Sequence, residues 1–166
     1  MKFWLTQIVI FGLLITSVRI IKSVQFDMHC GSYMTRAANA NTIAIAKDQM
    51  CIVVAYAESN GLTNGTTAVL WLDPNMDIGY WYNNMKSAYQ ELCSISPDAS
   101  SLEKSNMLIK LRESLLTQGK DGAELDCPDN ISLFPNNAFW IFILFLYGFD
   151  VIIGLVMYIN YLELFD

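Results

Sequence analysis

The sequence predicts an all-α membrane protein with two transmembrane helices flanking a small helical-bundle domain, and with room for one short β-hairpin. Of its 166 residues, 54% are hydrophobic and only 16% are charged, whereas about a quarter of a soluble domain is charged. Two long apolar runs lie near the ends of the chain. The segment between them repeats apolar residues at the spacing of amphipathic helices.

The first apolar run, residues 1–24, predicts an N-terminal transmembrane anchor. It contains "FWLTQIVIFGLLITSV", and about 20 apolar helical residues cover the hydrocarbon core of a bilayer. Lys2 followed by an apolar stretch also fits a secretory signal. However, Arg19 comes directly after "TSV", where a cleavage site would be expected, so we expect an anchor that is not removed. Because no proline intervenes, the anchor can continue into the next helix.

The helical domain, residues 25–137, is predicted to contain helices at about 31–59, 74–95 and 101–118. The first is rich in alanine and ends before Gly61, a residue type common at helix C-termini. The face that we expect it to bury comprises Met34, Ala38, Asn41, Ile45, Ile52 and Tyr56. Asn39 and Asn41 are poor helix formers that either fix the register of helix packing or face solvent.

The second and third helices have clearer starting signals. Asp73 can cap the second helix, with Pro74 at its first position, and an apolar stripe follows. Ser100 and Glu103 form a capping box at the start of the third helix, and Gly119 follows its end. Between helices, "TTAVLWL" is predicted as either a short strand or an extended loop, and "LDCPDNISL" as a small hairpin around its Pro-Asp-Asn turn.

The second apolar run, residues 138–162, predicts a C-terminal transmembrane helix with Asp150 near its centre. A carboxylate at this depth costs several kcal/mol unless it is protonated, paired or facing water. If the two runs are antiparallel with residue 24 level with residue 138, Asp150 is level with Gly12. Arg19 then lies about 10 Å away along the helix axis. We therefore do not expect an ion pair within the chain.

From this geometry we predict that Asp150 lies in a helix–helix interface with a partner subunit. Gly148 and Gly154 flank it at small-residue spacings that permit close approach of another helix. Other interpretations stay open. A carboxylate in a span can belong to a proton or ion pathway, or it can snorkel. A neutral Asp150 can also hydrogen-bond a polar side chain of the first run: Thr6, Gln7 or Thr16.

The most distinctive stretch of the helical domain is "GYWYNNMKSAYQEL". Consecutive helical residues point about 100° apart, so three aromatic residues in a row cannot all face one core. We expect Tyr80 to lie off the buried stripe. We predict a partner-contact surface formed by Tyr80, Trp81, Tyr82, Asn83 and Asn84. The alternative is a wide buried face in a small bundle.

The four cysteines are Cys30, Cys51, Cys93 and Cys127. No two of them have CxxC spacing, so a zinc site is not predicted. If the domain is exported, a disulfide between Cys30 and Cys127 is the pairing to test, because each lies at a similar distance from a span. Otherwise, we expect Cys51 and Cys93 to be small buried side chains on helices.

The sequence contains no recognisable catalytic or cofactor-binding motif. It has a single histidine, His29, and no GxSxG, HExxH, P-loop or GxGxxG pattern. We therefore expect no enzyme activity, no metal ligands and no cofactor, and His29 is expected to be an interfacial residue beside a structural Cys30. The net charge of −6 leaves no basic face for phosphates, so nucleic acid is not expected as a partner.

Several strings, "FDMHC", "RAANANTIAIAKDQM", "GLTNG", "IGYWYNNMKSAYQEL" and "PDNISLFPNN", together resemble a group of small bacterial two-span membrane proteins with no assigned function. The resemblance covers most of the chain and implies only a bacterial cell (inner) membrane. The cations Arg19 and Lys22 at the C-terminal end of the first run, with Arg36 beyond it, slightly favour a cytoplasmic domain. Long segments are translocated largely regardless of charge, so we expect an extracytoplasmic domain with both ends in the cytoplasm.

These features predict a non-catalytic accessory or structural subunit of a larger membrane complex. The chain stops at Asp166, soon after the second run, so we expect any output to pass through another protein. Its partners would be other membrane protein subunits or further copies of itself, within the lipid bilayer. The alternative is a small membrane-anchored sensor or regulatory module with a ligand pocket near Asn39, Asn41 and Tyr82.

Overall fold

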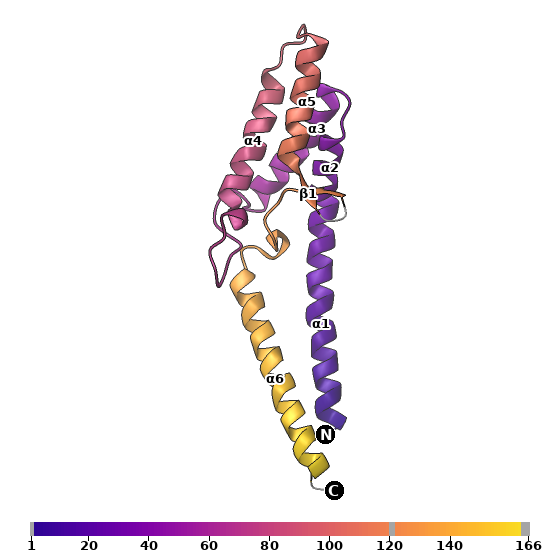
Figure 1. The fold of residues 1–166 in the computed structure, drawn as a ribbon, viewed down its shortest axis with the longest axis vertical. Coiled ribbons are helices and arrows are strands. Elements are labelled where there is room, and N and C mark those ends of the chain that lie inside the picture. Colours follow the sequence, from indigo (N-terminus) through magenta and orange to yellow (C-terminus); the bar gives the residue numbers. More distant parts are fainter. Residues whose placement is uncertain (1, 120–121, 164–166) are drawn as a thin grey trace.

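The computed structural model describes residues 2–119 and 122–163. The chain forms a long helical hairpin with a helical bundle at one end, and both termini lie at the other end (Figure 1). In chain order the elements are α1 (Lys2–Phe26), η1 (Asp27–Gly31), α2 (Ser32–Ala38), α3 (Ile43–Ser59), η2 (Pro74–Met76), α4 (Ile78–Ser94), α5 (Ser101–Leu115), β1 (Leu116–Gly119), β2 (Gly122–Leu125), η3 (Ile131–Leu133) and α6 (Asn137–Glu163). The predicted helical architecture is confirmed, and two of these helical stretches are long and apolar enough to cross a membrane.

The first long apolar helix continues into the bundle, as the sequence allowed. One helical stretch runs from Thr6 to Ala38, interrupted only by the wider π-helical turn η1. Gly31 ends this turn at a close contact: a Cβ there would lie 2.7 Å from Asp27 Oδ1 and 3.2 Å from Leu125 Cδ1. The absence of a side chain at Gly31 therefore lets strand β2 approach the helix.

The predicted helix over residues 31–59 is wrong, because the chain turns at residues 39–42 and folds back as α3. Asn39 Nδ2 donates to the Thr35 carbonyl at 2.9 Å, which ends α2. Thr42 Oγ1 accepts from the Ile45 amide at 3.3 Å and caps α3. Asn39 and Asn41 are both exposed, so of the two alternatives for these residues the solvent-facing one is present. Side-chain hydrogen bonds of this kind compete with helix continuation.

The break changes which face of α3 is buried. Its core residues are Ala46, Met50, Val53 and Ala57, whose spacing of four, three and four is that of one helix face. Ile45 and Ile52, which were predicted to be buried, are exposed. The prediction for Ile45 and Ile52 is wrong because of the turn. A helical periodicity continued unbroken through residues 39–42 places the wrong side chains of α3 against the core.

Helices α2, α3, α4 and α5 pack together around one core, into which α4 turns its apolar stripe. The buried residues of α4 are Ile78, Trp81, Tyr82, Met85 and Leu92. Asp77 caps α4 by accepting from the Tyr80 amide at 3.0 Å, whereas Asp73 and Pro74 begin the short helix η2 instead. The capping bond from Ser100 Oγ to the Glu103 amide, 3.1 Å long, is confirmed.

The β-hairpin lies earlier than predicted. Helix α5 ends at Leu115, and β1 and β2 pair antiparallel with Leu116 opposite Leu125. Residues 131–133, within the predicted hairpin, form the short helix η3 instead. Both Leu116 and Leu125 pack against the bundle core. The hairpin therefore forms where leucines can be buried, although "LTQG" and "GAEL" have little β propensity.

Candidate functional site

The hairpin formed by α1 and α6 is the first candidate site. The two helices converge toward their terminal ends (Figure 1). Contact is made through glycines, since a Cβ on Gly12 would lie 2.5 Å from Tyr147 Oη, and a Cβ on Gly154 would lie 3.1 Å from both Trp4 Nε1 and Ile8 Cδ1. Gly154 therefore belongs to the contact between the chain's own two helices.

Asp150 faces the space between these helices. It is half-buried and lines a cavity of about 320 Å³ together with Trp4, Gln7, Ile8, Phe11 and Tyr147. Asp150 is thus level with residues nearer the N-terminus than Gly12. The indole Nε1 of Trp4 is buried without a hydrogen-bond partner. A carboxylate and two groups that can donate hydrogen bonds, Gln7 and Trp4, therefore share one cavity.

Arg19, the cation that the sequence analysis considered for Asp150, is engaged elsewhere. Arg19 Nη2 donates to Asn130 Oδ1 at 3.1 Å, at the bundle end of α1. Within the part of the chain that the structure describes, the ion pairs are Lys86–Glu58 and Lys110–Glu91, both in the helical domain. Thr16, one of the predicted partners, donates to its own helix at Gly12 O, at a distance of 2.8 Å.

Gly148 lies on the other side of α6. A Cβ built there would meet no atom within 4 Å. It lines a groove with Leu70 and the apolar residues of α6. The two glycines that flank Asp150 therefore have different surroundings, because Gly154 packs on α1 and Gly148 opens outward.

The second candidate site is the predicted contact surface on α4. Tyr80 is 67% exposed, and Asn83 and Asn84 are exposed beside it. The inclusion of Trp81 and Tyr82 in this surface is wrong, because both side chains are buried in the core. Trp81 Nε1 instead donates to the Asp126 carbonyl at 3.0 Å and ties α4 to the segment after β2.

A polar groove lies next to Tyr80 and Asn84. It has a volume of about 470 Å³ and runs between η2 and α4 on one side and Ser114, Thr117 and residues 126–128 on the other. Its walls carry the carboxylates Asp77 and Asp126 and, among the described residues that line it, no basic side chain. A partner that enters this groove would therefore be favoured if it carried polar or basic groups.

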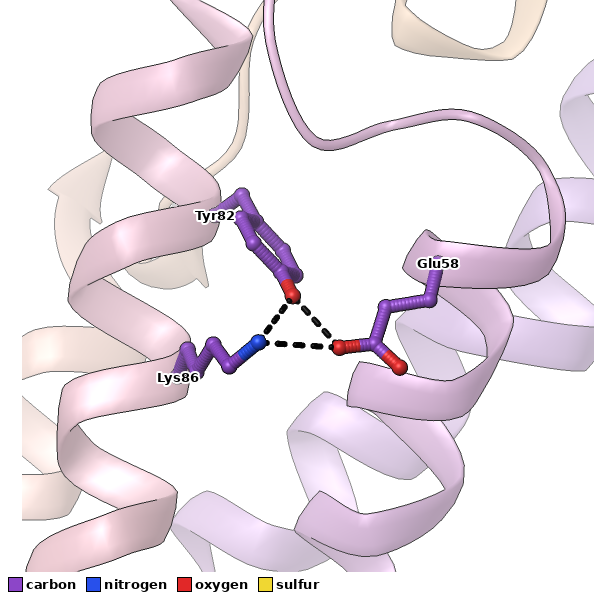
Figure 2. Close-up of polar contacts among 3 residues, drawn as sticks. All are labelled: Glu58, Tyr82 and Lys86. Atoms are coloured by element: carbon purple, nitrogen blue, oxygen red, sulfur yellow. Dashed lines mark hydrogen bonds and ion pairs between the residues drawn. The ribbon is translucent and has the colours of Figure 1, made fainter.

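A polar network that the sequence reasoning missed joins α3 to α4. Figure 2 shows Glu58, Tyr82 and Lys86 converging from the two helices. Tyr82 Oη donates to Glu58 Oε1 at 2.6 Å and accepts from Lys86 Nζ at 2.8 Å, while Lys86 and Glu58 form an ion pair at 3.1 Å. The sequence signal was the four-residue spacing of Tyr82 and Lys86, which places them on one helix face.

The network shifts the protonation of its two charged members. The hydrogen bond from Tyr82, followed by that from Lys86, lowers the pKa of Glu58 below its ordinary value. The bonds to Tyr82 and Glu58 raise the pKa of Lys86. Both groups are therefore held in their charged forms, which makes the network a cross-link between α3 and α4.

The predicted ligand pocket near Asn39, Asn41 and Tyr82 is not formed by these residues. Asn39 and Asn41 precede α3, whereas Tyr82 contacts Glu58 near its opposite end. At 1.5 Å per residue, the intervening helix separates the two places by roughly 25 Å. The asparagines form a turn, and Tyr82 is part of the cross-link described above.

The cysteines are free thiols. Cys30 is buried and Cys127 half-buried, and both belong to the hydrophobic cluster of the bundle. Burial, followed by the charges of Asp126 and Asp129, raises the pKa of Cys127 to about 11. No disulfide joins them, so the pairing of Cys30 with Cys127 stays a prediction.

Cys51 and Cys93 differ from expectation. They lie on α3 and α4 as predicted, but both are exposed rather than buried. Hydrogen bonds with Cys51 and Cys93, together with burial, raise the pKa of Tyr89 to about 12. A periodicity that was extended through the turn at residues 39–42 could not assign the face on which Cys51 lies.

His29 is exposed and stacks on Tyr56, with ring centroids 6.4 Å apart and planes at 15°. Within residues 2–119 and 122–163, no three His, Cys, Asp or Glu side chains gather in an arrangement that could hold a metal ion.

No protein-family model, curated protein or solved structure matches this sequence.

Proposed function

We propose that this protein is a non-catalytic accessory or structural subunit of a larger membrane complex, in the inner membrane of a bacterium. In this proposal α1 and α6 span the bilayer, and the helical bundle lies on the extracytoplasmic side. The span pair would contact partner helices near Asp150, and the bundle would present Tyr80 and Asn84 to the same complex.

The observation that carries the proposal is the environment of Asp150. This carboxylate lies midway along an apolar helix, in a cavity whose Trp4 N–H has no hydrogen-bond partner. Polar groups within a membrane are expensive unless they are satisfied. A polar side chain from a partner helix, entering the cavity, would satisfy both groups at once. The exposed Tyr80 beside an acidic groove supports a second contact in the bundle.

Partner retention tests the role of Asp150. Tagged wild-type chain, Asp150→Leu and Asp150→Asn would be purified from native membranes in mild detergent, and co-purifying proteins would be quantified by mass spectrometry. We expect Asp150→Leu to lose a stoichiometric partner, including any second copy of the chain, and Asp150→Asn to retain more of it because the amide still forms hydrogen bonds. Phe149→Leu, at the same depth but with an exposed side chain, is the matched control.

Unchanged co-purification with Asp150→Leu, in a chain that still resists carbonate extraction from membranes, would sink this proposal. The bundle contact is tested in the same way with Tyr80→Ala. We expect partner affinity to fall about tenfold, the usual effect of removing an anchoring aromatic residue. Asn106→Ala, an exposed polar residue on α5, should leave affinity unchanged.

The orientation is tested with a thiol reagent that cannot cross membranes. Asn64→Cys would be introduced into a chain whose exposed Cys51 and Cys93 have been replaced by serine. We expect labelling in intact spheroplasts. Labelling only after lysis would place the bundle in the cytoplasm.

A further inference from the structure

The segment between α3 and α4 forms a loop with a fixed neck. Thr66 and Asp77 form an antiparallel bridge, and the Thr67 amide donates to the Met76 carbonyl at 3.0 Å. The Ile78 amide donates to Gly65 O at 2.9 Å. Of the two conformations predicted for "TTAVLWL", the extended loop is therefore present. Its two ends are held together, so residues 68–73 project as one unit.

The tip of this loop is apolar and exposed. Leu70 is 56% exposed, Trp71 80% and Leu72 88%. Three consecutive large apolar side chains in this state are unusual on a surface that faces water, where they indicate a binding surface or a membrane contact. The loop thus presents a hydrophobic tip that nothing in the described chain covers.

The tip lies beside the start of the second span. Figure 1 shows the loop descending from the bundle to the level of the first turns of α6. Leu70 lines a groove of about 500 Å³ together with Ile141, Phe145, Gly148 and Ile152 of α6. Because a Cβ at Gly148 would meet no atom within 4 Å, the chain itself does not fill this groove. The loop therefore continues the apolar face of α6.

We propose that residues 68–72 are a membrane-interfacial anchor, with Trp71 and Leu72 inserted at the boundary between headgroups and acyl chains. The groove between Leu70 and α6 would then accommodate a lipid acyl chain. This inference rests on the proposal that α6 spans the bilayer. Tryptophan is enriched at this boundary because its ring is apolar and its N–H is polar. Thr67 and Asp73 bound the apolar tip with polar side chains.

The charge of the loop specifies the kind of lipid surface. Residues 60–77 contain Asp73 and Asp77 and no Lys or Arg. Insertion would therefore be driven by apolar burial alone, without attraction to anionic headgroups. A zwitterionic phosphatidylcholine bilayer should suffice, and added anionic lipid should not deepen insertion.

Spin-label accessibility tests the anchor in the full chain reconstituted into phosphatidylcholine nanodiscs. Single cysteines would be placed at Leu72, at Ile152 on α6 and at Leu102 on α5, in a background whose native cysteines are replaced. Leu102 is the matched control because it is also an exposed leucine, 69% exposed, but belongs to the first turn of α5, and α5 begins at the end of the bundle away from α6 (Figure 1). The ratio of oxygen to nickel-chelate accessibility would be measured at each position.

We expect the ratio at Leu72 and at Ile152 to exceed that at Leu102 severalfold. A high ratio at Ile152 with a Leu72 value equal to that of Leu102 would overturn the anchor while leaving the spans inserted. A low ratio at Ile152 would instead show that the span proposal has failed, and the anchor with it. A Leu72 label shielded from both oxygen and nickel would indicate a protein partner in this place and would also overturn the anchor.

A second measurement avoids replacing the native cysteines. In bilayers that contain lipids brominated near the carbonyl, we expect Trp71→Phe to remove a large part of the quenched tryptophan fluorescence. Trp81→Phe should remove only unquenched fluorescence, because Trp81 is buried in the bundle. If Trp71→Phe left the amount of quenched fluorescence unchanged, insertion of Trp71 would be contradicted.

Discussion

Replacing Gly154 by leucine should separate α1 from α6, whereas the same change at Gly148 should not. A Cβ at Gly154 already lies 3.1 Å from Trp4 Nε1 and Ile8 Cδ1, below the roughly 3.5–4.0 Å at which carbon atoms pack. Leucine adds three further carbons in the same direction, so small rotamer changes cannot relieve the clash. At Gly148 the same side chain enters open space.

The magnitude follows from the cost of overpacking, which is typically about 1–3 kcal/mol. That energy corresponds to a roughly 5- to 150-fold shift away from the closed hairpin. The assay is cross-linking by a short bismaleimide between cysteines introduced at Gln7 and Asp150, which line the same cavity, in a chain without other cysteines. We expect Gly154→Leu to lower the ratio of closed to open hairpin at least fivefold, the lower limit of that range, and the rate of cross-linking to fall with the closed fraction.

Gly148→Leu provides the control, because it adds the same volume to the same helix. Equal cross-linking of Gly154→Leu and the parent chain would show that the two helices do not pack at Gly154. An equal loss of cross-linking in both variants would mean that leucine disturbs α6 itself. The contact of Gly154 with α1 would then not account for the effect.

Three further predictions concern the bundle. Because the pKa of Glu58 is lowered from its ordinary 4.5, its contribution to stability should be complete above pH 4.5 and be lost as pH falls through the lower folded-state value. Urea unfolding followed by tryptophan fluorescence should show this loss. The Glu58→Gln variant should abolish the pH dependence. The pKa of Cys127 is raised from 9.0 to about 11, so its stabilising effect should be complete below pH 9 and be lost between pH 9 and 11, with Cys127→Ala flattening that part of the profile. At pH 8, iodoacetamide should modify the exposed Cys51 well before Cys127, and equal rates would contradict the burial described for Cys127.

The parts of the fold that rest on one local signal could be predicted from the sequence. The apolar length of the two runs, the stripe of α4 and the bond between Ser100 and Glu103 each depend on residues within a few turns of one another. The turn at residues 39–42 was missed although its signals were present, namely two asparagines followed by a threonine that can cap a helix. An alanine-rich composition on both sides outweighed them.

The candidate sites were harder to predict because they depend on which faces meet. Asp150 was identified from its position in an apolar run, but its neighbours Trp4 and Gln7 depend on the register between α1 and α6, which sequence alone does not set. The cross-link of Tyr82 with Glu58 joins helices separated by a long loop. Trp81 and Tyr82 are both buried because the bundle covers a wide arc of α4, as the alternative interpretation allowed.

The continuous helix from Thr6 to Ala38 gives the molecule a mechanical property. Its 33 residues form a rod about 50 Å long, whose lower part lies in the proposed span and whose upper part supplies Met34 and Ala37 to the bundle core. A tilt of about 10° at the membrane would displace the far end by roughly 9 Å, by the geometry of a rigid rod of that length. A partner that changed the tilt of α1 would therefore displace the bundle by a distance of this order.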